Sequence, residues 1–97
     1  MTYYTRQQLL ELLDLEESLF VALEREEIVQ GDAPSDAPGE FSERMLERAR
    51  VAANLVQELD VNLPGAGIIV RLREEMAELR HRMAEVLAEL ERRATRG

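Results

Sequence analysis

Residues that could do chemistry are sparse in this chain. His81 is the single histidine, and one imidazole without neighbouring ligands cannot hold a metal ion. The carboxylate pairs Glu74/Glu78 and Glu85/Glu89 have the i, i+4 spacing that could chelate a hard cation, yet this spacing is routine on helices rich in Arg and Glu. No nucleophile–base pair is suggested. The pattern therefore predicts no catalytic residue, no metal site and no cofactor.

Two missing residue types exclude further classes of chemistry. The 97 residues include no cysteine, which excludes disulfides, a thiol nucleophile and a thiolate metal site. Each of the 12 basic side chains is Arg, so lysine-based covalent catalysis is excluded as well. The loop Gly31–Gly39 has glycines at its ends, but Asp32 and Asp36 oppose phosphate binding there. We expect a protein that binds a partner, not an enzyme.

The acidic residues are concentrated at the N-terminal end. The net charge is −8; residues 1–40 hold ten acidic and two basic side chains, whereas residues 41–97 hold ten of each. A surface of one sign attracts a surface of the opposite sign and speeds their association, and salt weakens the effect. The distribution predicts a basic protein surface as the partner.

The expected second helix, about residues 15–26, carries the centre of this acidic region. Four carboxylates and one aromatic ring share an outward arc of about 100 degrees on a helical wheel. An aromatic residue ringed by charges has the composition of an interface centre with a charged rim. The face could equally be a solvated acidic surface, and the ring could turn inward to the core. The predicted partner-binding residues are Glu16, Glu17, Phe20, Glu24 and Glu27.

Recognition of DNA by the same helix is the competing function. A DNA-reading helix needs Arg or Lys to neutralise phosphates, because that term supplies most of the non-specific affinity. Only Arg25 is available, and the neighbouring carboxylates would repel the duplex. A basic second helix would favour DNA binding; an acidic one opposes it.

A long apolar stripe runs from Pro64 to about Arg93. Its residues are spaced by alternating threes and fours, the heptad spacing of a helix that pairs with another helix. We expect a homodimer through this helix. The alternative is packing along the expected third helix, which could cover only the first half of the stripe. The orientation stays open because methionines adapt to either arrangement. The predicted dimerisation residues are Ile69, Leu72, Met76, Leu79, Met83, Val86 and Leu90.

The remaining pattern predicts an all-α winged helix-turn-helix with a small β-wing, followed by the long helix. Helices are expected at about residues 6–13, 15–26 and 43–59, and the wing at 28–41. Ile28-Val29 and Glu40-Phe41 are its expected strands. We expect residues 1–60 to form the winged part and 61–97 the long helix of the same single domain.

Localisation is predicted from what the chain lacks. No apolar run approaches the length that spans a bilayer. The N-terminus MTYYTRQQ has neither the basic start nor the apolar run of a signal peptide. We expect a cytoplasmic protein that does not bind membranes.

Three stretches carry a resemblance to a known family. They are Tyr4-Thr5 at the start of the first helix, Leu15–Val29, and above all Leu59–Leu79 (LDVNLPGAGIIVRLREEMAEL). The order of elements looks like the MerR-type winged helix, and within it the chain resembles most closely the chaperone modulators of the CbpM type, over about residues 4–82. In that family a glycine usually ends the second helix, where this chain has Glu27.

The resemblance implies a bacterial cytoplasmic protein without enzymatic activity. It would bind the J-domain of a DnaJ/CbpA-type co-chaperone and block stimulation of the DnaK-type chaperone. Two other functions stay open: a MerR-type DNA-binding transcription regulator, and a purely structural oligomerisation module.

Overall fold

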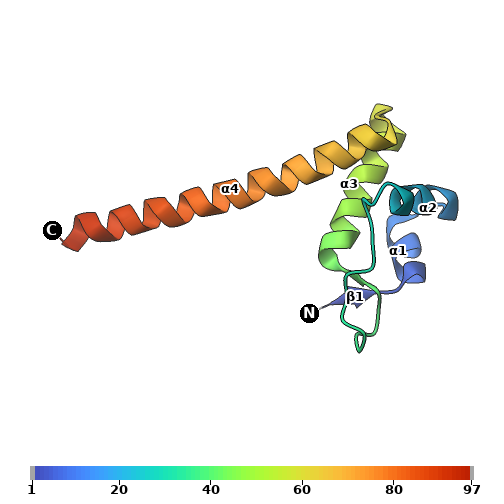
Figure 1. The fold of residues 1–97 in the computed structure, drawn as a ribbon, viewed down its shortest axis with the longest axis horizontal. Coiled ribbons are helices and arrows are strands. Elements are labelled where there is room, and N and C mark those ends of the chain that lie inside the picture. Colours follow the sequence, from blue (N-terminus) through green and yellow to red (C-terminus); the bar gives the residue numbers. More distant parts are fainter. Residues whose placement is uncertain (1, 97) are drawn as a thin grey trace.

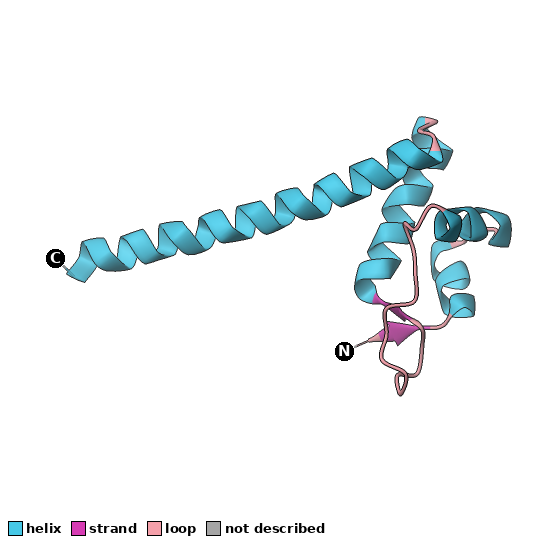
Figure 2. Ribbon diagram, viewed as in Figure 1, coloured by secondary structure: helices cyan, strands magenta, loops and turns pink. Residues whose placement is uncertain are grey.

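The computed structural model describes residues 2–96, in which four helices and two short strands follow one another. Figures 1 and 2 show α1, α2, α3 and the strands gathered into one body, from which α4 projects. The expected fold class is confirmed: predominantly helical, with a small antiparallel sheet and a long C-terminal helix. The elements are β1 (Tyr3–Tyr4), α1 (Arg6–Leu13), α2 (Glu17–Arg25), β2 (Phe41–Ser42), α3 (Glu43–Leu59) and α4 (Leu63–Arg96).

The ends of α1 explain why α2 follows so closely. Thr5 and Gln8 form a capping box, in which the Thr5 side chain accepts from the Gln8 N–H and Gln8 accepts from the Thr5 N–H. Asp14 ends α1 in the left-handed region with φ 51°, which turns the chain sharply. Glu16 then precedes α2 without a side-chain capping bond. These two short helices form the helix-turn-helix pair.

The prediction that residues 28–41 form a wing with paired strands Ile28-Val29 and Glu40-Phe41 is wrong. Phe41–Ser42 pairs antiparallel with Tyr3–Tyr4, and Ile28-Val29 is not a strand. Both Ile28 and Val29 are buried, whereas successive strand residues face opposite sides. Their N–H groups bond back to the Leu23 carbonyl at 3.0 and 3.4 Å, so this dipeptide closes the end of α2.

Small residues set the packing of α3 against α4. Ser42 caps α3, and Asn62 accepts from the Gly65 N–H at 2.7 Å beside Pro64 in the first turn of α4. The side chains that meet are small, which lets the two helices approach closely. Buried there are Ala49, Ala52 and Ala53 of α3 and Ala66, Gly67 and Val70 of α4.

The molecule is elongated because α4 extends beyond its own domain. The radius of gyration is 17.3 Å and the principal extents are 59 × 36 × 19 Å. A compact chain of this length has a radius of gyration near 13 Å. Figure 1 shows α4 leaving the end of α3 and running far past it. Between residues 2 and 96, none of the helices has the length and apolarity needed to cross a membrane.

Candidate functional site

The exposed side of α2 is acidic, as predicted. Glu16, Glu17 and Glu27 are exposed, and Glu17 leaves 71% of its side chain in solvent. Glu26, next to the end of the helix, is exposed as well. Arg25 is the one basic residue among them. Two guanidinium groups from other helices also reach this surface: Arg6 lies 3.5 Å from Glu17, and Arg71 donates to the Glu26 carbonyl at 3.5 Å. Carboxylates still outnumber the basic groups, which opposes contact with nucleic-acid phosphates.

The predicted role of Phe20 at the centre of that surface is wrong. Phe20 is fully buried, with 0% of its surface exposed. Its ring meets Phe41 edge to face, with centroids 5.6 Å apart and an interplanar angle of 88°. Phe41, the ring's partner, belongs to the strand β2. Phe20 therefore joins α2 to the sheet and contacts no partner.

Glu24 also stabilises the fold, because it joins α2 to α1. Arg6 of α1 donates to Glu24 at 2.6 Å and lies 3.5 Å from Glu17. The same guanidinium stacks 4.6 Å from the centroid of Phe20. The hydrogen bond that Arg6 donates to the Glu24 carboxylate raises the pKa of Arg6. Because Glu24 is half-buried and paired with Arg6, and Glu17 is exposed but also close to Arg6, the carboxylates of the predicted set that lie outside any ion pair of residues 2–96 are those of Glu16 and Glu27.

Glu27 has a backbone conformation that favours glycine. Its φ is 58°, in the left-handed region, directly after the end of α2. Only this conformation lets Ile28 and Val29 return to the core, with Ile28 N–H bonded to the Leu23 carbonyl. In this left-handed conformation a residue with a Cβ atom is destabilised by steric repulsion between the Cβ and the backbone. The acidic side chain at this position is thus held outward at a conformational cost.

The apolar stripe on α4 is largely uncovered. Ile69 is half-buried. The six residues beyond it are exposed by 50–59% of their surface, so α3 covers only the beginning of the stripe. A helix that leaves so regular an apolar face in water has the form of one half of a helix pair. The exposed six are Leu72, Met76, Leu79, Met83, Val86 and Leu90.

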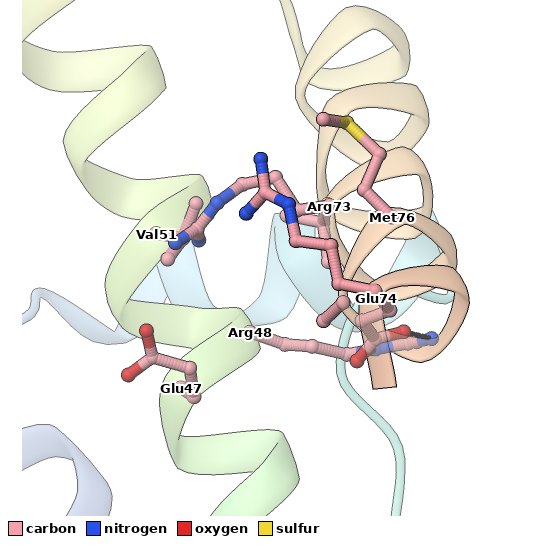
Figure 3. Close-up of a pocket in the computed structure, with 9 residues that line it drawn as sticks. Glu47, Arg48, Val51, Arg73, Glu74 and Met76 are labelled. Carbon is pink, nitrogen blue, oxygen red and sulfur yellow. Dashed lines mark hydrogen bonds and ion pairs between the residues drawn. The ribbon is translucent and has the colours of Figure 1, made fainter. Parts of the chain in front are cut away.

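A groove of about 400 Å³ lies between α3 and α4, beside this stripe (Figure 3). Its lining is largely apolar, and Met76 belongs both to the groove and to the stripe. Figure 3 shows Val51 of α3 facing Arg73 of α4 across it. The apolar lining is Val51, Val70, Met76 and Ala77, and the two arginines at its α4 side are Arg73 and Arg80.

An ion-pair network at the inner end of the groove joins α3 to α4, and sequence reasoning missed it. Arg48 is buried, with 9% exposure, and donates to Glu74 at 2.6 and 3.0 Å and to the Ile28 carbonyl at 3.3 Å. Arg44 donates to the same carboxylate at 3.1 Å. These hydrogen bonds, led by those from Arg48, lower the pKa of Glu74 from 4.5 to about 2. A signal was available: Arg48 stands among the buried positions Met45, Ala49 and Ala52.

Apart from Glu74, which pairs with Arg48, the candidate ligand residues form surface ion pairs along α4. His81 is 74% exposed in its side chain and lies 2.8 Å from Glu85, one turn along α4. Glu78 pairs with Arg82, and Glu89 with Arg92 and Arg93, as surface ion pairs. Among residues 2–96 there is no group of three or more His, Cys, Asp or Glu side chains placed to hold a metal ion.

The helix-turn-helix pair, the small sheet and the projecting helix define the class of MerR-like winged helix-turn-helix proteins. Comparison with protein families agrees, because the family described as "MerR HTH family regulatory protein" matches residues 4–88. The chain belongs to this family of regulatory proteins, which is generally non-enzymatic. No curated protein and no solved structure matches the chain.

Proposed function

We propose that this protein is a chaperone modulator of the CbpM type. It binds the J-domain of a DnaJ/CbpA-type co-chaperone and inhibits stimulation of the DnaK-type chaperone. One observation carries the proposal. The α2 helix, which would read DNA in a regulator of this family, contains one basic residue, Arg25, and the carboxylates of Glu16, Glu17 and Glu27 are exposed along it and at its ends. Such a surface suits a basic protein partner and repels nucleic acid.

The resemblance in Leu59–Leu79 supports the same partner. This stretch forms the corner between α3 and α4, where Asn62 caps the long helix and Gly67 lies against Ile28. A Cβ on Gly67 would lie 3.4 Å from the Ile28 side chain, ordinary van der Waals contact, so the corner packs directly on the end of α2. The corner thereby holds α2, and the carboxylates around it, in a fixed place.

The proposed mechanism is competition between this protein and the DnaK-type chaperone for one basic surface of the J-domain. J-domains carry a strongly basic second helix, which the DnaK-type chaperone normally engages. Carboxylates on α2 would occupy that helix and exclude the chaperone. Exposed charges are screened over about 8 Å at physiological ionic strength, so this attraction speeds association and weakens as salt is added.

Calorimetric titration of the protein into isolated J-domains of the same organism tests the proposal. We expect micromolar or tighter binding that weakens between about 50 and 500 mM salt. The variant Glu16→Arg/Glu27→Arg reverses two free carboxylates and leaves the Arg6–Glu24 pair intact. We expect it to weaken binding at low salt by roughly tenfold or more.

A matched control separates a specific surface from net charge. Asp36 and Glu40 are also exposed, but they lie in the loop before β2. The variant Asp36→Arg/Glu40→Arg changes the net charge by the same amount and is expected to bind nearly as the wild type does. Equal loss in both variants would refute the α2 surface, and affinity independent of salt would refute the electrostatic mechanism.

We further propose that α4 pairs two copies into a homodimer. The support is the exposed stripe from Leu72 to Leu90, which α3 does not reach. Burying such side chains contributes about 1.5–3 kcal/mol each before entropy is subtracted. Sedimentation velocity over a concentration series should show a dimer, and a monomer persisting at high micromolar concentration would refute the pairing.

DNA-binding regulation is the second candidate, since the chain belongs to a family of HTH regulators. Its test is fluorescence anisotropy with duplex DNA at low salt, where non-specific binding is strongest. Binding of DNA by the wild type would favour this candidate over the J-domain.

A further inference from the structure

Arg6 of α1 is in contact with three residues of α2 at once. Its Nη1 donates to Glu24 Oε1 at 2.6 Å, and its Nε lies 3.5 Å from Glu17 Oε1. The guanidinium carbon lies 4.6 Å from the centroid of the Phe20 ring. Glu17, Phe20 and Glu24 are three and four residues apart, so they follow one face of α2 over two turns. One guanidinium group therefore lies over an aromatic ring that has a carboxylate on either side.

These contacts fix the orientation of the Arg6 side chain. A guanidinium is planar and rigid, stacks on an aromatic face and carries several N–H donors in a fixed fork. The side chains of Arg6 and Glu24 are only 32% and 33% exposed, whereas that of Glu17 is 71% exposed. Partly buried pairs are screened by salt much less than exposed ones. Arg6 therefore orients both carboxylates, and it holds Glu24 more tightly than Glu17.

Both carboxylates keep one oxygen available to a partner. Arg6 contacts the Oε1 atom of each, and within residues 2–96 neither Oε2 atom takes part in a hydrogen bond or an ion pair. An ionised carboxylate accepts hydrogen bonds through both of its oxygens. Two carboxylates against one guanidinium also leave one negative charge unbalanced. The group formed by Arg6, Glu17 and Glu24 can therefore accept one more cation, the side chain of a Lys or Arg on a basic surface.

Oriented carboxylates and unpaired ones affect binding differently. Glu16 and Glu27 lie outside the ion pairs of the described chain, and exposed charges of this kind mainly speed the encounter of two proteins. A side chain that becomes immobile only on binding loses rotamer freedom, which weakens the complex. For Glu17 and Glu24 that loss is smaller, because Arg6 already restricts them. Hydrogen-bonded charge pairs in an interface act mainly on the dissociation rate.

We propose that Arg6 is a positioning residue for partner binding: it holds Glu17 and Glu24 so that their available oxygens accept one basic side chain of the J-domain. The inference rests on the proposed function and names the carboxylates that retain the partner after the encounter. Arg6 acts through these two carboxylates and is itself positively charged. Its removal makes the surface more acidic, so attraction by net charge and positioning by Arg6 predict opposite effects on affinity.

Arg6→Gln and Arg25→Gln separate the two effects, because each removes one positive charge. Arg25, the last residue of α2, is exposed, and its side chain makes no hydrogen bond or ion pair within the described part of the chain. Surface plasmon resonance with the isolated J-domain measures both rate constants at low salt. We expect Arg25→Gln to bind about two- to threefold more tightly, through faster association. We expect Arg6→Gln to bind roughly tenfold more weakly, through faster dissociation without slower association.

Arg6→Lys is the second variant, since it keeps the charge and an aliphatic stem over Phe20 but lacks the planar fork. We expect an unchanged association rate and a faster dissociation rate, measured at a temperature where thermal melts show each variant folded. Equal tightening by Arg6→Gln and Arg25→Gln would overturn the inference alone, as would wild-type dissociation rates in both Arg6 variants. A wild type that does not bind the J-domain would overturn the proposed function together with the inference.

Discussion

The pair formed by Arg48 and Glu74 allows a quantitative prediction about stability. A folded-state pKa of about 2 against the ordinary 4.5 means that the native protein binds this proton more weakly than the unfolded chain. The contribution is fully present above about pH 4.5 and is lost as the pH falls toward 2. At 1.36 kcal/mol per pKa unit the difference corresponds to about 3.4 kcal/mol. Because 31% of the Glu74 side chain is exposed, screening reduces this to about 2 kcal/mol.

Glu74→Gln removes that contribution and leaves Arg48 buried without a counter-charge. We expect the free energy of unfolding to fall by about 2–3 kcal/mol at pH 7, and the difference from wild type to shrink below pH 4. Urea unfolding followed by circular dichroism, at one fixed protein concentration, measures it. Glu78→Gln is the control one turn away, since Glu78 is 62% exposed in its pair with Arg82. The control should stay within about 0.5 kcal/mol. Equal losses in both variants, or a loss for Glu74→Gln that persists at pH 2.5, would refute the reasoning.

Three further substitutions test local features. Phe20→Ala should lower the free energy of unfolding by about 3–5 kcal/mol because the ring is fully buried, whereas Leu12→Ala, at a 61% exposed position, should change it little; thermal melts compare the two. Glu27→Gly should raise stability by about 0.5–1 kcal/mol by relieving the left-handed conformation, and an unchanged or lower melting temperature would contradict this. Gly39→Ala should be destabilising, since a Cβ there would lie 2.4 Å from the Tyr4 carbonyl carbon; a wild-type urea midpoint would contradict the close contact.

Local signals in the sequence were enough to place most helices. The expected helix at 6–13 coincides with α1, because Thr5 and Gln8 define its start and the chain turns at Asp14. The expected helix at 43–59 coincides with α3, where Ser42 supplies the cap. The second helix is shorter than expected, Glu17–Arg25 against 15–26. At its start Glu16 makes no side-chain capping bond, and at its end the chain leaves the helix at Glu26.

Tertiary contacts decided what the sequence patterns could not. The partner of Phe41–Ser42 is Tyr3–Tyr4, nearly forty residues away, and no local pattern in the chain signals this pairing. The helical wheel placed Phe20 in the middle of the acidic arc, whereas in the structure its ring turns inward and packs against Phe41. Arg48 stands among buried positions of α3, but its partner Glu74 comes from another helix, and no local pattern indicates that pairing.

The most direct test of the proposed function measures inhibition. The ATPase rate of the organism's DnaK-type chaperone is measured with its DnaJ/CbpA-type co-chaperone while this protein is added in increasing amounts. We predict that the stimulated part of the rate falls toward the basal rate, and that Glu16→Arg/Glu27→Arg needs a higher concentration for the same effect. An undiminished stimulated rate at saturating wild-type protein would contradict the account.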